Sequence, residues 1–425
     1  MNTMQKYRIL GKKGEGTFSE VLKCQSIENG HYYACKRMKQ HFDSLEQVNN
    51  LREIQCMRRL SPHANVVDLK EVIFDKKTGT LALIIELLDM NLYEVIKGRR
   101  NYLTETKCKQ YTYQTLKALD HMHRNGIFHR DIKPENILLK NDVVKLADFG
   151  SCRSVYSKQP YTEYISTRWY RAPECLLTDG WYTYKMDLWS VGCVFAEIMS
   201  LRPLFPGSNE LDQITRIHSV LGTPTPELLN KFKKSKHMDF NFPEKKGSGL
   251  SSQLPHISRD ALKMVAMMCI YDPEDRPSAK QILRQLYFRP LRDADKRIRA
   301  MEKVTHLSND IFSNYDDSSI TTLRSKEHGF PKKVSMHHHL IAAPVTKNTY
   351  PDHTYRTTLP KIPVATYSGN INNNKTVGKY PTTMFPSLMQ KERERVKAQN
   401  DTTKRLGYAE YSFPSLNRFR HGHRL

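Results

Sequence analysis

Three short motifs in the middle of the chain restrict its possible folds more than any other feature of the sequence. They are FHRDIKPEN at residues 128–136, DFG at 148–150 and APE at 172–174. A single DFG in an unknown protein is usually a turn, and a lone HRD is usually surface charge. Chance does not readily produce all three in this order and at these spacings, so the motifs indicate one shared catalytic apparatus.

Two further features precede these motifs. Residues 14–21 read GEGTFSEV after a β-type run, and their small side chains let backbone amides approach phosphate groups closely. An ordinary hairpin turn is the alternative for this segment alone. Lys36 then ends a β-type run and Glu53 lies in a helical stretch, where an ion pair between them would hold the ammonium against phosphates. Either residue by itself would be read as solvated surface charge.

In combination, these motifs resemble those of the eukaryotic protein kinases. The resemblance covers residues 4 to about 288 and implies an α+β, bilobal protein kinase fold. A small, mostly β N-lobe with one key helix would span 7–88, and a larger, mostly α C-lobe would span 89–288. The implied reaction transfers the γ-phosphate of ATP to serine or threonine in a protein.

The resemblance also implies a role for each chemistry-bearing residue. Asp131 accepts or orients the proton of the substrate hydroxyl, Lys133 steadies the γ-phosphate, and the ion pair described above completes the catalytic set. Asn136 and Asp148 offer the hard oxygen ligands that suit Mg²⁺. These residue types fit phosphoryl transfer, because its loose transition state is stabilised mainly by positioning of the reactants and by charge neutralisation.

The implied nucleotide site lies between the lobes. Ile85 takes the gatekeeper position, and backbone groups of Glu86 and Leu88 face the adenine. The residues expected to contact ATP are Lys13, Gly14, Glu15, Gly16, Thr17, Phe18, Ser19, Val21, Ala34, Lys36, Ile85, Glu86, Leu88 and Leu138. Ser19 replaces the third glycine of the usual G-x-G-x-x-G, and Lys13 replaces an aliphatic residue. These departures keep open a second hypothesis, a nucleotide-impaired pseudokinase that works as a scaffold.

The segment before the APE motif predicts a regulatory switch. It contains TEY at 162–164, and the spacing of Thr162 and Tyr164 resembles the dual-phosphorylation site of mitogen-activated kinases. Phosphates at these positions would add charge that Arg130 and neighbouring arginines can pair with. Activity is therefore expected to depend on an upstream activating kinase.

Two segments indicate the kinase group. The run WYR at 169–171 and the stretch from about 212 to 249 resemble the group that contains the cyclin-dependent and mitogen-activated kinases. This group generally favours proline after the phosphoacceptor, so the expected protein substrates carry Ser-Pro or Thr-Pro sites. Four further segments resemble one branch of the group, at 14–21, 32–36, 49–55 and 151–164. That branch implies a cytoplasmic setting, with the cilium and the nucleus as further locations.

Hydrophobic periodicity predicts the elements that carry these motifs. The β-type runs include 20–24, 32–36 and 81–86, and the helical runs are 44–60, 104–125, 185–201, 209–221 and 258–271. Gly126 is the expected stop of the second helix. The resemblance to the protein kinases further implies that Asp187 anchors the backbone of the catalytic loop and that Arg276 pairs with Glu174.

Beyond residue 288 the composition changes. Residues 291–425 hold 23 Lys and Arg against 12 Asp and Glu, with no Cys or Trp, so 289–425 is predicted to be a basic, largely disordered tail. The net charge of +23 attracts phosphate-rich partners. No zinc spacing, aromatic RNP pattern or dense Lys/Arg run supports nucleic-acid binding, so solvated charge is the favoured interpretation. The tail could instead bind other proteins.

The cysteines and the apolar residues bear on the setting of the chain. All eight cysteines lie in the first 270 residues without a C-x-x-C pair, which predicts reduced thiols in an intracellular protein. Cys152 is interpreted as a small buried hydrophobe, with a reactive thiol as the alternative. The first residues lack a signal-type apolar segment and no run of 18 apolar residues occurs, so no membrane span is expected. The chain is expected to be a monomer.

Overall fold

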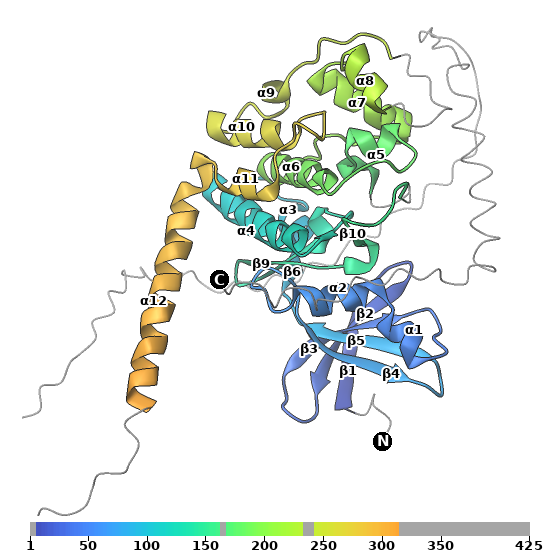
Figure 1. The fold of residues 1–425 in the computed structure, drawn as a ribbon, viewed down its shortest axis with the longest axis vertical. Coiled ribbons are helices and arrows are strands. Elements are labelled where there is room, and N and C mark those ends of the chain that lie inside the picture. Colours follow the sequence, from blue (N-terminus) through green and yellow to red (C-terminus); the bar gives the residue numbers. More distant parts are fainter. Residues whose placement is uncertain (1–5, 162–166, 233–241, 314–425) are drawn as a thin grey trace, which may run out of the picture. The chain divides into compact units, whose positions relative to one another are not determined.

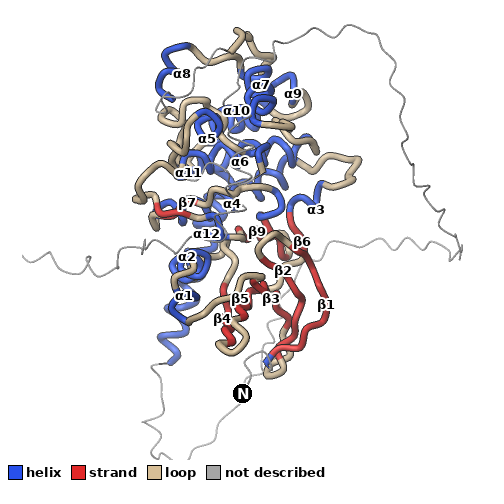
Figure 2. The backbone as a smooth tube through the Cα atoms, turned by 90° about the vertical axis from the view of Figure 1, so that its right-hand side faces the viewer, coloured by secondary structure: helices blue, strands red, loops and turns tan. Residues whose placement is uncertain are grey.

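The computed structural model describes residues 6–161, 167–232 and 242–313, with side chains described up to residue 302. Within these residues a small β-rich lobe precedes a larger helical lobe, as Figures 1 and 2 show. This arrangement confirms the predicted α+β fold with two lobes. In the same part of the chain, no helix is both long and apolar enough to cross a membrane.

The small lobe is a five-stranded antiparallel sheet with the strand order β1-β2-β3-β5-β4 (Figure 1). Its strands are β1 (Tyr7–Glu15), β2 (Ser19–Ser26), β3 (Tyr32–Met38), β4 (Leu69–Asp75) and β5 (Thr80–Glu86). Successive side chains point to opposite faces of a sheet. Leu22, Cys35 and Ile84 therefore pack together on one face, in a cluster of buried side chains. All three predicted β-type runs lie within these strands.

The helix expected at 44–60 is divided in two. Helix α1 (Leu45–Asn49) begins at Ser44, whose side chain caps the first turn, and α2 (Arg52–Leu60) starts after two non-helical residues. The expectation of one continuous helix is therefore wrong at Asn50, which ends α1. Asparagine favours helix ends because its side chain competes for backbone hydrogen bonds.

The large lobe is built around α6. Every residue from 186 to 199 on this helix is buried, which is typical of a helix at the centre of a lobe. Helix α4 ends before Gly126, whose φ of 72° makes it the predicted stop. The helices of this lobe are α3 (Leu92–Ile96), α4 (Glu105–Arg124), α5 (Pro173–Leu177), α6 (Lys185–Ser200), α7 (Glu210–Leu221), α8 (Pro226–Phe232), α9 (Leu250–Gln253), α10 (Arg259–Met268) and α11 (Ala279–Leu283).

Short strands hold the two ends of the loop that carries the first motif. Strands β6 (Met90–Asn91), β8 (Ile137–Lys140) and β9 (Val143–Leu146) form one small sheet, and β7 (Ile127–Phe128) pairs with β10 (Arg153–Ser154). The loop starts directly after β7 and ends at β8. Both of its ends are therefore fixed by backbone pairing.

The tail begins as a helix. Helix α12 (Arg289–Ser313) follows the large lobe directly, and its Asp295 accepts hydrogen bonds from Tyr113 at 3.0 Å and Lys117 at 2.8 Å on α4. The expectation of largely irregular chain from residue 289 therefore does not hold for α12, because these contacts fix it to α4. The rest of the predicted tail, from residue 314, lies outside the described residues.

The eight cysteines are all among the described residues, and all are free and buried. Burial raises the pKa of Cys35 to about 11 and that of Cys108 to about 12. The pKa of Cys152 also lies well above its ordinary value because of burial. A thiol with a raised pKa is a poor nucleophile at neutral pH, so Cys152 is a buried side chain as expected.

Candidate active site

Lys36 on β3 and Glu53 on α2 form the predicted ion pair. The Lys36 Nζ lies 2.5 Å from Glu53 Oε1, and also 3.0 Å from Oδ1 of Asp148. Burial lowers the pKa of Lys36, but the two carboxylates raise it by more, so the pKa lies above its ordinary value. The ammonium therefore stays charged and ties β3, α2 and the DFG motif together.

Asp131, Lys133 and Asn136 converge in the loop between β7 and β8. Asp131 Oδ2 accepts hydrogen bonds from Lys133 Nζ at 2.9 Å and Asn136 Nδ2 at 3.0 Å. The other oxygen, Asp131 Oδ1, is buried and has no hydrogen-bond partner among the described residues. One carboxylate oxygen is thus held in place while the other remains available as an acceptor.

Asp187, at the start of α6, holds the backbone of this loop as predicted. Its carboxylate accepts the N–H of His129 at 2.9 Å and the N–H of Arg130 at 2.8 Å, and His123 Nε2 lies 2.9 Å from Oδ2. Burial raises the pKa of Asp187, but these contacts lower it by more, so the pKa lies below its ordinary value. Arg130 has a φ of 72°, a conformation that non-glycine residues rarely adopt and that the two bonds to Asp187 stabilise.

The DFG segment is oriented by its neighbours. Asp148 has a φ of 64°, and the ring of Phe149 packs edge-on against His129 with 5.6 Å between the ring centroids. The Nε2 of the same histidine lies 3.0 Å from the carbonyl oxygen of Ala147. Strained backbone of this kind persists only where the surroundings fix it, and here it turns the Asp148 carboxylate toward Lys36.

Asn136 and Asp148 suit a divalent metal. The Nδ2 of Asn136 donates to Asp131, which leaves its amide oxygen as a ligand. Burial raises the pKa of Asp148, but Lys36 lowers it by more, so this half-exposed carboxylate stays ionised. An amide oxygen and a carboxylate are hard ligands that magnesium-type ions prefer over thiols.

The glycine-rich segment joins β1 and β2. The Gly16 N–H donates to the carbonyl of Ser19 at 2.7 Å, and Lys39 Nζ donates to the Gly16 carbonyl at 2.9 Å and to Glu15 at 2.6 Å. A Cβ added at Gly14 would meet no atom within 4 Å, and one at Gly16 would make only ordinary contact. Packing inside the chain therefore gives no reason for glycine here, whereas a ligand approaching the backbone would.

The other residues expected around a nucleotide lie along β1, β2, β3, β5 and β8. Ala34 lies on β3 two residues before Lys36, and it is paired with Ile85 on β5. The Glu86 side chain accepts the Asp68 N–H at 2.9 Å and the Glu86 N–H donates to the Asp68 carbonyl at 3.2 Å, so the backbone carbonyl, and not the N–H, is the group of Glu86 to face a ligand. Lys13, Thr17 and Phe18 are exposed, and among the residues that the structure describes no hydrogen bond or ion pair joins them to the catalytic residues. Val21, Leu88 and Leu138 are half-buried.

Arginines gather near Tyr161, the last described residue before the TEY motif. The buried Arg130 guanidinium lies 5.9 Å from the ring centroid of Tyr161 and 5.8 Å from that of Tyr182. Burial, together with repulsion from Arg52 and Arg130, lowers the pKa of Arg153 to about 10. Arg130 is the arginine predicted by number for this place, and Arg52 and Arg153 are neighbouring arginines that the prediction did not number. Thr162 and Tyr164 themselves lie outside the described residues.

A buried ion pair joins the APE motif to the end of the large lobe, as predicted. Arg276 donates to Glu174 through Nη1 at 2.7 Å and Nη2 at 3.0 Å, and neither side chain is more than 1% exposed. The guanidinium also lies over the ring of Trp189. This bidentate contact fixes the position of α5 within the lobe.

Comparison with known proteins gives the family of the chain. Residues 7–288 match the model of the protein kinase domain. The chain is 59% identical over 335 residues to the mouse (Mus musculus) MAPK/MAK/MRK overlapping kinase, covering 79% of each chain. It is 65% identical over 294 residues to the human (Homo sapiens) protein of that name, covering 69% of this chain and 70% of the relative. Human serine/threonine-protein kinase MAK is 42% identical over 287 residues, covering 67% and 46%. The chain therefore belongs to the protein kinase family, and it is a protein serine/threonine kinase that binds ATP.

Proposed function

We propose that the chain phosphorylates Ser-Pro and Thr-Pro sites with magnesium-bound ATP, and that phosphorylation of Thr162 and Tyr164 switches the activity on. The observation that carries the catalytic part is the arrangement of Asp131, whose Oδ2 is held while its buried Oδ1 has no partner in the described chain. Residues 7–88 and 89–288 act as the two lobes of one kinase domain, and 289–425 as its tail.

Asp131 Oδ1 accepts the proton of the substrate hydroxyl. Lys133, whose ammonium donates to Oδ2 of Asp131, neutralises charge on the γ-phosphate. Lys36, held by Glu53, pairs with the α- and β-phosphates. Magnesium, when bound, neutralises phosphate charge, and Asn136 with Asp148 would hold it.

The nucleotide lies along the sheet of the small lobe. The backbone of 14–21 covers its phosphates, Ala34, Ile85 and Leu138 enclose the adenine, and backbone groups of Glu86 and Leu88 hydrogen-bond to its edge. The exposed Lys13 covers the adenine with its aliphatic stem while the ammonium reaches water. Among the described residues no hydrogen bond or ion pair of Ser19 or Lys13 reaches the catalytic residues, so the enzyme is proposed ahead of the pseudokinase alternative.

The switch rests on the buried Arg130 and the half-buried Arg153, whose Nε atoms have no hydrogen-bond partner among the described residues. Burial and repulsion from Arg52 and Arg130 lower the pKa of Arg153, and a phosphate on the neighbouring segment would form several charge-assisted hydrogen bonds with these two arginines. Each such bond contributes about 1.5 to 3 kcal/mol. The phosphate would thereby order the segment that precedes the APE motif.

The double variant Thr162→Ala, Tyr164→Phe is expected to lose specific activity on the order of tenfold or more, because the charge that orders the segment is gone. The kinase assay uses full-length protein first phosphorylated in cells. Tyr156→Phe is the matched control, because Tyr156 is an exposed tyrosine just before the same segment. Wild-type specific activity in the double variant would refute the switch.

The kcat/KM of a Ser-Pro peptide is expected to be on the order of tenfold higher than that of the matched Ser-Ala peptide. This is the usual discrimination that one apolar pocket provides. The support is the run at 169–171, where the indole of Trp169 donates to the Gly207 carbonyl at 3.0 Å and fixes the segment next to the site. A peptide array with and without proline after the serine is the measurement. Equal rates for both peptides would remove proline direction from the proposal.

The setting and the partners follow from the same proposal. The partners are protein substrates, an upstream activating kinase and proteins that bind the tail, and the catalytic chain acts as a monomer. The cytoplasm is the proposed location, with the cilium and the nucleus as further sites. The eight free, buried cysteines are compatible with a reducing compartment.

A further inference from the structure

Helix α12 extends away from the large lobe and carries apolar side chains in an exposed stretch (Figure 1). Every residue from Lys296 to Glu302 is exposed, and these seven residues cover all faces of the helix because they make about two turns. Ile298 is 54% exposed and Met301 is 67% exposed. Helices in proteins owe most of their stability to packing of an apolar face, so this stretch offers a surface for a partner.

The apolar residues of α12 recur at the spacing of a coiled coil. Leu291, Ala294, Ile298 and Met301 follow one another at intervals of three, four and three residues, which are the a and d positions of a heptad. Leu291 packs against the core of the large lobe. The exposed part of the stripe, which we call the α12 seam, therefore begins at Ile298 and includes Met301. A stripe limited to a and d positions is narrow and fits another helix.

The charges beside the α12 seam indicate which helix fits. In this register Arg297 takes a g position and Glu302 the e position five residues later. In a parallel pair of helices, the g position of one helix lies next to that e position of the other. Two copies of α12 would therefore form two Arg297–Glu302 ion pairs, related by the twofold symmetry of the pair. The described ion pairs of α12 use Asp293 and Asp295, and neither Arg297 nor Glu302 takes part in them.

An anionic lipid surface fits the α12 seam less well than a second copy. Glu302 borders the seam, so its carboxylate would lie against negatively charged headgroups. A second copy presents Arg297 at that place instead. Lys296 and Arg299 take f and b positions, which stay solvated on the outer side of a two-stranded coiled coil.

We propose that α12 pairs with α12 of a second copy of this chain, as a parallel two-stranded coiled coil that begins at Ile298. A β-branched residue at an a position favours two strands. The next two heptad positions, Thr305 and Ser308, are polar in the sequence, so the association is reversible and depends on concentration. Each copy keeps its catalytic set within one chain, so catalysis by a single chain, as proposed above, is unchanged.

Cysteine cross-linking of full-length protein tests the register. Met301→Cys places a thiol at a d position, where a parallel pair brings residue 301 of both copies together. Oxidised glutathione joins two such thiols in a disulfide and is itself reduced to two glutathione thiols, so a covalent dimer is expected on a non-reducing gel. Lys296→Cys is the matched control, because this side chain is 78% exposed but takes an outer position, and it should remain monomeric. The eight native cysteines are buried and should not react.

Charge reversal, followed by analytical ultracentrifugation of full-length protein, tests the partner. The fraction of wild-type dimer should rise with concentration. Arg297→Glu and Glu302→Arg should each weaken the dimer on the order of tenfold, because like charges then face each other twice. The double variant restores opposite charges and should lie within about twofold of wild type. Arg299→Glu is the matched control, since it makes the same charge change at an outer position and should leave the dimer unchanged.

Three results would overturn the pairing. The first is a wild type that sediments as a monomer at every concentration up to its solubility limit. The second is a yield of covalent dimer from Met301→Cys that does not exceed the yield from Lys296→Cys, and the third is a double charge variant that stays as weak as the single variants. A lipid surface would be the occupant instead if the monomeric chain sedimented with phosphatidylserine vesicles and Arg299→Glu reduced this binding as much as Arg297→Glu.

Discussion

Replacing Asp131 with asparagine is expected to lower kcat about 10³-fold while ATP binding stays intact, because general acid–base catalysis contributes about 10²- to 10⁴-fold. Lys133 and Asn136 both donate to Asp131, so the amide oxygen of the new side chain would face them. Its NH₂ group would then take the place of Oδ1, where it cannot accept a proton. The measurements are kcat with a serine peptide and the dissociation constant of magnesium-bound ATP.

Asp260→Asn is the matched control, since Asp260 is an exposed aspartate on α10 far along the chain from the catalytic loop. It should keep wild-type kcat. If Asp131→Asn retained most of the activity, Asp131 would not be the proton acceptor. If the wild type itself transferred no phosphate but bound partners, the pseudokinase alternative would replace the enzyme.

The catalytic set could be predicted from the sequence because local motifs carry most of it. Asp131, Lys133 and Asn136 lie within six residues, and their mutual hydrogen bonds follow from one loop conformation. The long-range pair of Lys36 and Glu53 was also predicted, because its residues stand at recognisable points of a strand and a helix. The strained backbone could not be predicted from these motifs. The positive φ of Arg130, for example, is fixed by the buried Asp187, which lies on helix α6.

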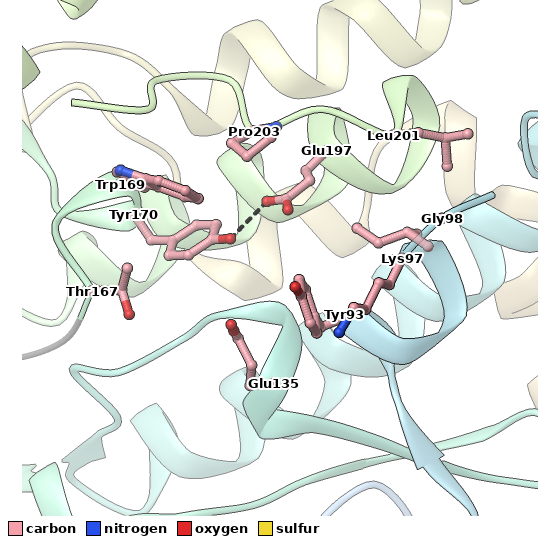
Figure 3. A pocket seen from close by; sticks show the side chains of 11 residues that line it. Tyr93, Lys97, Gly98, Glu135, Thr167, Trp169, Tyr170, Glu197, Leu201 and Pro203 are labelled. Atoms are coloured by element: carbon pink, nitrogen blue, oxygen red, sulfur yellow. Dashed lines mark hydrogen bonds between the residues drawn. The ribbon is translucent and has the colours of Figure 1, made fainter. Parts of the chain in front are cut away.

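Other features could not be predicted, because they depend on packing between distant segments. The apolar pattern alone runs through the break at Asn50, because Val48 on α1 and Ile54 on α2 are both buried in one cluster with Leu81 of the sheet. Helix α12 is fixed by the contact of Asp295 with α4, and composition alone indicates a polar tail. In the sequence Glu197 is one more residue of an apolar helix, and only the fold places it across a cavity from Glu135 (Figure 3).

The largest expected effect on stability follows from breaking the pair between Arg276 and Glu174. Arg276→Met is expected to lower the free energy of unfolding by about 3 to 5 kcal/mol, because it leaves a buried carboxylate without its cation. The guanidinium also donates to the carbonyls of Ile270 and Lys185, both at 2.9 Å, and these acceptors lose their partner as well. For a domain of this size the midpoint of thermal unfolding should fall on the order of 10 °C.

Urea unfolding of the wild type, Arg276→Met, Glu174→Gln and the double variant separates the charge from the packing. The double variant Arg276→Met, Glu174→Gln should be more stable than the sum of the single changes indicates, because the unpaired charge is removed together with its partner. Arg216→Met is the matched control: its ion pair with Asp212 at 3.0 Å lies on the surface of α7, so the cost should stay below about 1 kcal/mol. Equal decreases in the free energy of unfolding for Arg276→Met and Arg216→Met would show that burial of the pair does not stabilise the lobe.

The folded fraction of Arg276→Met should retain its kcat at low temperature, because the pair positions α5 and does not contact the catalytic loop residues Asp131 or Lys133.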